Sequence, residues 1–181
     1  MISLIKPSIK YADDIMEIRR EFLEEKPDED IHGAGNLREC TSAEEWIHYV
    51  ENMRQRETCP ENLVDSDIYL AVREEDDRIV GIAEFRHHID HPILCVWGGH
   101  IGYCVRPSEQ RKGYAGIILE QILDICRTYE IHKVLLTCSE DNLASERTIR
   151  GGGGVYEKTV WAEPLKVNMK RFWIDVDQGD T

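Results

Sequence analysis

The segment from His100 to Cys138 constrains the fold most, because it combines a strand, a turn, a helix and a second strand within about forty residues. The run from His100 to Val105 predicts a strand that stops at Arg106-Pro107, since proline has no N–H to donate to a sheet ladder. A helical spacing follows, carried by Ala115, Ile118, Leu119, Ile122 and Cys126, and the apolar residues 134–136 predict the next strand. Such a unit is a βαβ crossover, so we expect two parallel neighbouring strands with a right-handed connection.

The patterns around this unit predict further helices and strands. A short strand at 2–8 precedes one helical face, formed by Tyr11, Ile15, Ile18 and Phe22. A capping box, formed by Thr41 or Ser42 with Glu44 or Glu45, predicts the start of a second helix. This helix continues to Met53. The later elements are hairpin strands at 68–72 and 79–85, a short helix from Asp141 or Asn142 to Ile149, and strands at 155–161 and 167–174. The expected fold class is α/β, a single domain of residues 1–181 with a mixed, mostly antiparallel sheet, one parallel strand pair and flanking helices.

Charge and composition exclude several classes of partner. The chain carries 22 basic and 35 acidic side chains, a net charge of −13, which repels phosphate backbones. We therefore expect no nucleic acid partner and favour a cationic or amine substrate. No apolar run approaches the roughly 18 residues of a membrane span, and no signal peptide pattern is present, so the prediction is a cytoplasmic protein with no membrane partner. The six cysteines form no CxxC pair, which favours free thiols over disulfides, and the sequence leaves a homodimer open.

The link from Val105 to Ala115 joins a strand end to a helix start. The first N–H groups of a helix have no intrahelical partner and carry partial positive charge, so they are suited to bind an anion. Gly113 would let a phosphate approach the backbone, and Arg106, Arg111 and Lys112 add three cations. An ordinary capped surface helix with basic residues is the alternative. Other phosphate loops fit less well, because the chain contains no GxxxxGK[ST] pattern and its glycine run at 151–154 precedes a strand.

Two motifs resemble a known family. The sequence Gln110-Arg111-Lys112-Gly113-Tyr114-Ala115 looks like the [QR]-x-x-G-x-[GA] acetyl-CoA signature of the GNAT superfamily of N-acetyltransferases. Asn142-Leu143-Ala144-Ser145 resembles the family's later N-x-x-[SA] element, and the order of predicted elements agrees over nearly the whole chain. The chain is also similar to a group of bacterial acetyltransferases, known mainly as predicted ones, in the segments 86–87, 98–103 and 172–174.

The resemblance implies acetyl-CoA as cosubstrate and a set of residues that bind it. N–H groups of Arg111, Lys112, Gly113, Tyr114 and Ala115, beside Gln110, would hold the CoA pyrophosphate. The backbone of Tyr103, Cys104 and Val105 would pair with the pantetheine as an added strand does. Asn142 and Ser145 would lie beside the pantetheine and the thioester.

The catalytic residues are less clearly marked. Many family members have a tyrosine seven residues after the asparagine as the acid for the departing thiolate, but this chain has Ile149 there. Tyr156 could substitute, or Ser145 through water, or a thiolate could leave without an acid. The candidate bases for the amine are Glu84, which interrupts an apolar strand, and His100, whose imidazole titrates in the useful range. An outward-facing polar residue and a structural histidine are the respective alternatives.

Two polar clusters invite other interpretations. The run His87-His88-Ile89-Asp90-His91 suggests a metal site, but adjacent histidines on a strand point to opposite faces, so we expect none. The acidic run 28–30 lies in the loop that borders the acceptor site in the resembled family; a solvated acidic loop is the alternative.

The leading hypothesis is therefore an acetyl-CoA-dependent N-acetyltransferase acting on a primary amine by direct transfer with general-base assistance. A non-catalytic acyl-CoA-binding regulatory domain and a nucleotide-binding module are the rivals. The acceptor stays open among polyamines, aminoglycosides, amino acids and protein amines.

Overall fold

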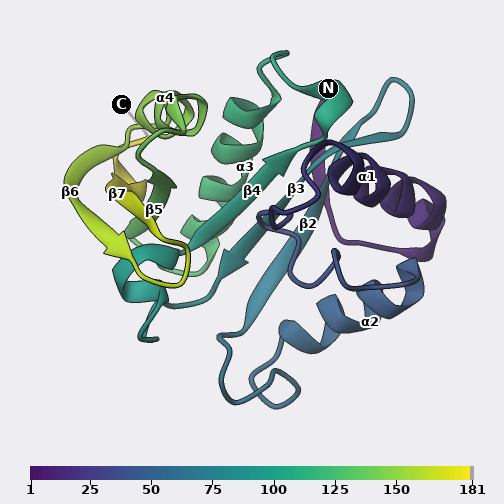
Figure 1. The fold of residues 1–181 in the computed structure, drawn as a ribbon, viewed down its shortest axis with the longest axis horizontal. Helices are drawn as coiled ribbons and strands as arrows, with labels where there is room; N and C mark the ends of the chain where they lie inside the picture. The colour runs from purple at the N-terminus through teal and green to yellow at the C-terminus, as the bar shows by residue number, and fades with distance from the viewer. Residues whose placement is uncertain (180–181) are drawn as a thin grey trace.

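The computed structural model describes residues 1–179, and its elements follow the predicted order (Figure 1). The strands are β1 (Ile2–Ile5), β2 (Ser66–Arg73), β3 (Arg78–Arg86), β4 (Ile101–Val105), β5 (Lys133–Ser139), β6 (Val155–Ala162) and β7 (Val167–Asp175). The α-helices are α1 (Ala12–Glu25), α2 (Ala43–Met53), α3 (Tyr114–Thr128) and α4 (Leu143–Gly151). Between β3 and β4, the irregular stretch predicted from the sequence contains one π-helical turn, Leu94–Gly98.

The strands form two antiparallel sheets. The first has the order β1-β2-β3-β4 and the second the order β5-β7-β6. They meet where the backbone N–H of His100 donates to the carbonyl of Leu135 at 2.8 Å. The preceding Gly99 has φ of 73°, and a side chain there would begin 2.6 Å from the Leu135 carbonyl oxygen, so this close approach requires glycine. β4 and β5 are thus neighbours near the start of both strands, as predicted, but no parallel ladder joins them within residues 1–179. The mixed sheet with one parallel strand pair expected from the sequence is instead two antiparallel sheets.

Alternating side chains of the first sheet supply two cores. On one face Ile68, Leu70 and Ile82 pack with α1 and α2, while on the other Ala71, Val80 and Phe85 pack with α3. This period of two follows from the pleat of a strand. The first sheet therefore lies between α1 and α2 on one side and α3 on the other, as Figure 1 shows.

Both predicted helix caps are confirmed. The Ser42 hydroxyl accepts from the N–H of Glu45 at 3.2 Å, and the Glu45 carboxylate accepts from the N–H of Thr41 at 2.8 Å, so this capping box joins residues 41, 42 and 45. At α4 the Asn142 side chain accepts from the N–H of Ser145 at 3.1 Å. This bond fixes Ser145 at the start of a helix that lies close to β4.

The remaining structural expectations concern cysteines, membranes and metals. All six cysteines are free, and Cys95 is the exposed one. Among residues 1–179 no helix has both the length and the apolar character needed to cross a bilayer. Over the same residues, no group of three or more His, Cys, Asp or Glu side chains is arranged to hold a metal ion.

Candidate active site

The β4–α3 link forms an open helix start. Gly113 has φ of 85° and is the residue from which α3 begins, and residues 110–113 are exposed. No atom lies within 4 Å of the point where a Gly113 side chain would begin, so the surface above the first helical N–H groups is free. The geometry is that of an anion site at a helix N-terminus, built around a left-handed residue that favours glycine.

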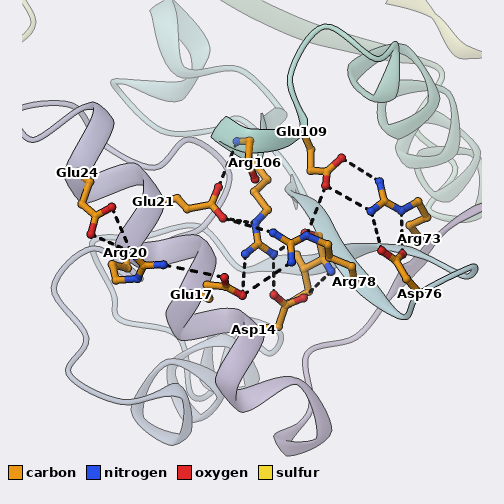
Figure 2. A network of polar contacts seen from close by, with 12 residues as sticks. Asp14, Glu17, Arg20, Glu21, Glu24, Arg73, Asp76, Arg78, Arg106 and Glu109 are labelled. Carbon is orange, nitrogen blue, oxygen red and sulfur yellow. Dashed lines mark hydrogen bonds and ion pairs between the residues drawn. The ribbon is translucent and has the colours of Figure 1, made fainter.

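The three cations near this helix start have different surroundings. Arg106 is fully buried, and its guanidinium contacts the carboxylates of Asp14 at 2.6 Å, Glu21 at 2.7 Å and Glu17 at 3.0 Å (Figure 2). Burial opposes ionisation of Glu21, but hydrogen bonds from Arg106 and from Ser108 outweigh it, so the pKa of Glu21 lies below its ordinary value. Arg106 therefore ties the end of β4 to α1 and does not face a ligand.

Lys112 is also engaged. Its ammonium lies 2.7 Å from the carboxylate of Glu109. Arg73 contacts the same carboxylate at 2.8 Å, as Figure 2 shows. Of the three predicted cations, only the exposed Arg111 has no ion pair within the described part of the chain. An anion placed here would therefore meet backbone N–H groups and Arg111, whereas Arg106 and Lys112 are already paired with carboxylates.

The outer edge of β4 is the second feature of the site. β4 pairs with β3 on one side and is the last strand of its sheet, so the N–H and C=O groups of its other edge have no strand partner beyond the His100 contact. This edge includes backbone groups of residues 103–105 and leads directly into the open helix start. A free strand edge is able to pair with an extended ligand that carries amide groups.

The side chains of Tyr103, on β4, and Ser145, on α4, are in contact. The Tyr103 hydroxyl lies 3.2 Å from the Ser145 hydroxyl, and both side chains are half-buried. Burial raises the pKa of the Tyr103 phenol above its ordinary value. Asn142 and Ser145, both predicted to lie beside the pantetheine, are thus next to each other and close to Tyr103. For Tyr103 the sequence predicted a role of the backbone alone.

A cavity of about 490 Å³ opens beside the same strands, and Glu84 lies in its wall. The Ser66 hydroxyl donates to one carboxylate oxygen of Glu84 at 2.8 Å, and the Arg86 guanidinium contacts the other at 2.8 Å. Arg86 lines the cavity too, and the other polar lining residues are Asp30, His32, Asn36, Glu39, Tyr49 and His91. The apolar ones are Ile31, Met53, Leu63, Val64, Ile93 and Leu94. Each carboxylate oxygen keeps a second lone pair, so Glu84 is able to accept a further hydrogen bond from a ligand in the cavity.

His100 lies outside this lining and is 6% exposed. Its Nδ1 accepts the backbone N–H of Leu135 at 2.9 Å. Burial lowers the pKa of His100 to about 4, so the ring is neutral at pH 7. These contacts are those of a structural histidine, the alternative stated above.

The predicted substitute acid is separated from these residues. Tyr156 lines a different hollow of about 810 Å³, together with Arg127, Gly152 and Trp173, and none of the predicted CoA-binding residues lines it. The Tyr156 hydroxyl is hydrogen-bonded to Thr159 at 2.9 Å. Ile149 is fully buried in the core, so its position offers no polar group to the gap.

Three side chains that contact the predicted residues were not predicted from the sequence. Ser66 and Arg86 hold Glu84, and the Tyr103 side chain faces Ser145. Because Arg86 follows Glu84 by two residues on one strand, period-two alternation was a usable signal for that ion pair. Ser66 is paired with Arg86 across the hairpin, a register that depends on the bulge between Ala71 and Val72.

The comparisons with known proteins concern the family and the fold. The model of the acetyltransferase (GNAT) family matches residues 15–151. Comparison with curated protein sequences finds no match. Among solved structures, the Microcin C7 self immunity acetyltransferase MccE, in complex with acetyl-CoA and AMP, has a TM-score of 0.69 at 20% identity, over 96% of this chain and 92% of that one.

Two further structures have similar folds. RimJ from Mycobacterium smegmatis, in complex with CoA-disulfide, has a TM-score of 0.72 at 16% identity, over 99% of this chain and 84% of that one. A spermidine N-acetyltransferase SpeG chimera from Vibrio cholerae and hSSAT has a TM-score of 0.64 at 17% identity, over 98% and 96%. At these identities the structures support the fold, and the family model covers well over half of the chain. The chain belongs to the GNAT family of acetyltransferases.

Proposed function

We propose that residues 1–181 act as one acetyl-CoA-dependent N-acetyltransferase that moves the acetyl group directly to a primary amine, with Glu84 as the general base. One observation carries the proposal: the free edge of β4 runs into an open helix N-terminus, which suits an extended ligand with amides at one end and phosphates at the other. CoA has this chemistry. The solved structures of MccE and RimJ contain acetyl-CoA and CoA-disulfide, respectively.

The residues of the β4 edge and the α3 start have separate tasks in this proposal. The first N–H groups of α3, at Arg111 to Ala115, bind the pyrophosphate, and Gln110 borders them. The backbone of Tyr103, Cys104 and Val105 binds the pantetheine amides. Acetyl-CoA supplies the thioester whose acetyl carbon accepts the amine. Asn142 orders the start of α4 and so keeps Ser145 next to this edge.

Glu84 is placed to handle the amine. In the β3–β4 register it stands opposite Gly102, three residues before Val105, or about 10 Å along the strand. Its carboxylate lies in the cavity wall, held by Ser66 and Arg86, and accepts the proton that the amine must lose. Positioning of the amine against the thioester supplies the rest of the acceleration.

The acceptor we propose is cationic. Asp30 and Glu39 lie at the cavity together with Glu84, in a chain of net charge −13. The acidic loop predicted to border the acceptor site thus contributes one lining residue, Asp30. Apolar lining from residues such as Met53, Leu63 and Leu94 provides room for a hydrocarbon portion of the amine.

The competing function is a non-catalytic acyl-CoA-binding regulatory domain. It is favoured by the ion pair that occupies Glu84 and by the buried Ile149 at the usual acid position. Turnover separates the two functions, because a binding domain holds acetyl-CoA without releasing its thiol.

The test is thiol release from acetyl-CoA with grouped amines: polyamines, aminoglycosides, amino acids and peptide N-termini. We expect turnover with a cationic group, and a loss of about 100-fold or more in kcat for Glu84→Gln, the usual effect of removing a general base. Glu120→Gln, on the exposed face of α3, is the matched control and should keep the parent rate. Binding of acetyl-CoA without turnover of any amine would favour the regulatory domain instead.

A further inference from the structure

His87 lies between two aspartates at the open end of the β2–β3 hairpin. The terminal pair of this ladder is Ser66 with Arg86, and His87 follows Arg86 directly. The His87 Nδ1 lies 2.6 Å from a carboxylate oxygen of Asp65, and its Nε2 lies 3.0 Å from one of Asp67. These three residues, the His87 cluster, have side chains that are at most 17% exposed.

The geometry of the cluster requires a protonated ring. A neutral imidazole has one N–H donor and one bare nitrogen, whereas an imidazolium donates from both nitrogens. Both partners of the His87 ring are carboxylates, so only the charged ring makes two hydrogen bonds here. Burial opposes this charge, but the hydrogen bonds with Asp67 and Asp65 outweigh it, so the pKa of His87 lies above its ordinary 6.5.

Asp67 stays ionised throughout the range in which a histidine titrates. The hydroxyl of Tyr129, just after α3, donates to the Asp67 oxygen that faces His87, and Arg54 contacts the other oxygen at 3.2 Å. Lys6 adds a more distant positive charge. Burial opposes ionisation of Asp67, but the hydrogen bonds from His87 and Tyr129 lower its pKa to about 2.

The Asp65 carboxylate has two further charged neighbours. Arg56 lies 3.9 Å and His88 3.8 Å from its second oxygen. Burial opposes ionisation of Asp65, but the bond from His87 contributes most to outweighing it, so the pKa of Asp65 lies below its ordinary value. The charge of the cluster near neutral pH is therefore governed by the His87 ring, with His88 as the neighbouring histidine that a test must separate from it.

The His87 cluster and Glu84 lie on opposite faces of the same strand ends. Phe85 packs into the core beneath α3, and its ring lies 5.7 Å from the His87 ring. Since side chains alternate along a strand, Glu84 and Arg86 face the other way, toward the cavity that they line. The His87 backbone N–H also donates to the carbonyl of Asp65 at 3.0 Å, so the cluster continues the hairpin one step beyond its ladder.

Each residue that holds Glu84 is next in the chain to a member of the cluster. Ser66, whose hydroxyl donates to Glu84 at 2.8 Å, lies between the two aspartates in the sequence. Arg86, whose guanidinium contacts the other carboxylate oxygen at 2.8 Å, directly precedes the histidine. A movement of these strand ends would therefore displace both partners of the Glu84 carboxylate.

We propose that the His87 imidazolium is a positioning residue for Glu84: it joins the ends of β2 and β3 and so keeps both bonds to the Glu84 carboxylate in place. The proposal rests on the proposed function, in which Glu84 accepts the proton of the amine. The His87 ring does not line the cavity, so it acts through Glu84 and not on the acceptor. Loss of the ring proton removes one of the two bonds to the aspartates and leaves the carboxylate less firmly placed.

The test compares the parent with His87→Gln, whose amide offers one donor and one acceptor as a neutral imidazole does. The readout is the ratio of the parent kcat to the variant kcat with acetyl-CoA and the preferred amine, because this ratio cancels the pH dependence of the amine itself. A misplacement of about 1 Å can cost about 100-fold, so we expect a ratio of about 10 at about pH 6 for a loosened carboxylate. The KM for acetyl-CoA should stay within about threefold, since the β4 edge is unchanged.

The pH profile of this ratio distinguishes positioning by charge from packing. A group with a raised pKa contributes fully below its ordinary 6.5 and loses its effect as the pH rises through its folded-state pKa. The ratio should therefore fall toward 1 by about pH 9.5, with a midpoint above 6.5 that equals the midpoint of the His87 ring signals in NMR. His88→Gln, which removes the adjacent and more exposed histidine, is the matched control and should keep a ratio near 1 at every pH.

Two further variants test the route of the effect. In a Glu84→Gln background, His87→Gln should lower kcat by less than about twofold, because the group that His87 positions is already gone. Asp65→Asn keeps the ring but removes one carboxylate, so the NMR midpoint of His87 and the midpoint of the parent-to-His87→Gln ratio, measured with Asp65→Asn in both proteins, should move together to lower pH.

Every other outcome overturns the proposal. A ratio that is constant with pH would assign His87 to packing, and equal losses with and without Glu84 would show that it does not act through that residue. An NMR midpoint at or below 6.5 would mean that the aspartates do not hold a proton on the ring. Thermal unfolding checks that each variant folds. A parent protein that acetylates no amine would overturn the proposed function as well, whereas an active parent with a flat ratio overturns the positioning role alone.

Discussion

Glu84 and His100 are both nearly buried polar side chains, yet their surroundings give them different capacities. Glu84 lies in a cavity wall with lone pairs left over after its bonds to Ser66 and Arg86. His100 uses Nδ1 to accept the N–H of Leu135 and is neutral at pH 7, because burial lowers its pKa to about 4. Glu84 can therefore accept a further hydrogen bond from a ligand in the cavity, whereas His100 holds the two sheets together.

The depressed pKa of His100 makes stability depend on pH. Its folded-state pKa lies below the ordinary 6.5, so its contribution is present above pH 6.5 and is lost as the pH falls toward 4. The shift of roughly 2.5 units corresponds to about 3 kcal/mol at pH 4. We expect His100→Asn, whose amide oxygen replaces Nδ1 as acceptor, to flatten this part of the pH dependence in urea unfolding between pH 4 and 7.5. An unchanged slope in the variant would mean that His100 is not the group that titrates.

Single residues show where sequence reasoning ends. Glu84 was identifiable because a charged residue interrupts an apolar strand, and Asn142 because it precedes a short helix. His100 is bonded to Leu135, which lies thirty-five residues away in the chain. The residues next to His100 in the sequence therefore do not indicate that its side chain is buried. The same holds for Tyr103, whose hydroxyl meets a helix forty-two residues further along.

Two elements, α1 and the β4–α3 link, are held together by Arg106. Its guanidinium has three carboxylate partners on successive turns of α1, at Asp14, Glu17 and Glu21. The carbonyl of Ile79 accepts a further hydrogen bond from it at 3.1 Å. A buried charge is favourable only when it is paired in this way. The network places α1, and the loop after it, relative to the start of α3.

Removal of Arg106 should therefore destabilise the protein strongly. Arg106→Met leaves three carboxylates without their common partner, so we expect the free energy of unfolding to fall by about 3 kcal/mol, as for other broken buried ion pairs. Arg20→Met is the control, since Arg20 pairs with Glu24 on the exposed face of the same helix and should cost less than about 1 kcal/mol (Figure 2). Equal losses in urea unfolding for the two variants would contradict the structural role given to Arg106.

Elements were predictable where their signals are local. The periods of 3.6 and 2, the capping residues and the proline after β4 mark most element boundaries. The separation into two sheets was not predictable, because it depends on β4 and β5 forming no ladder beyond the contact between His100 and Leu135, and no local residue pattern encodes this. The pairing of Lys112 with Glu109 was missed although the two are three residues apart, since each was considered for its own charge alone.

Over the whole molecule negative charge predominates, and acidic residues also outnumber basic ones in the lining of the cavity beside Glu84. Asp30 and Glu39 lie at that cavity together with the Glu84–Arg86 ion pair, and the exposed Arg111 lies at the start of α3. Long-range attraction of a cationic amine falls with ionic strength, because screening shortens from about 10 Å at 0.1 M to about 3 Å at 1 M.

We expect kcat/KM for a cationic acceptor to fall severalfold between low and high salt, with kcat nearly constant. Asp30→Asn should weaken this dependence more than Asp28→Asn does, since Asp30 lines the cavity and Asp28 does not. A flat salt profile for the preferred amine, or a neutral or anionic preferred acceptor, would assign the acidic surface to solubility alone.

Family and fold were within reach of the sequence, because the motif around Gly113 and the order of elements extend over most of the chain. The cavity beside Glu84 was not, since it is assembled from the segments 30–39, 49–53, 63–64, 84–86 and 91–94, whose meeting depends on the complete fold.

The most direct measurement of the donor site is a titration of backbone amide signals with CoA and, separately, with ATP. The free edge of β4 and the open start of α3 predict that CoA shifts or protects the amides of residues 103–105 and 111–115 and that ATP reaches only the second group. Gly113→Val should weaken the CoA effect by at least tenfold in affinity, whereas Gly116→Ala, at an equally open position one turn on, should not. CoA signals that map away from these amides, or an unchanged affinity in folded Gly113→Val, would contradict the placement of the acetyl donor along β4.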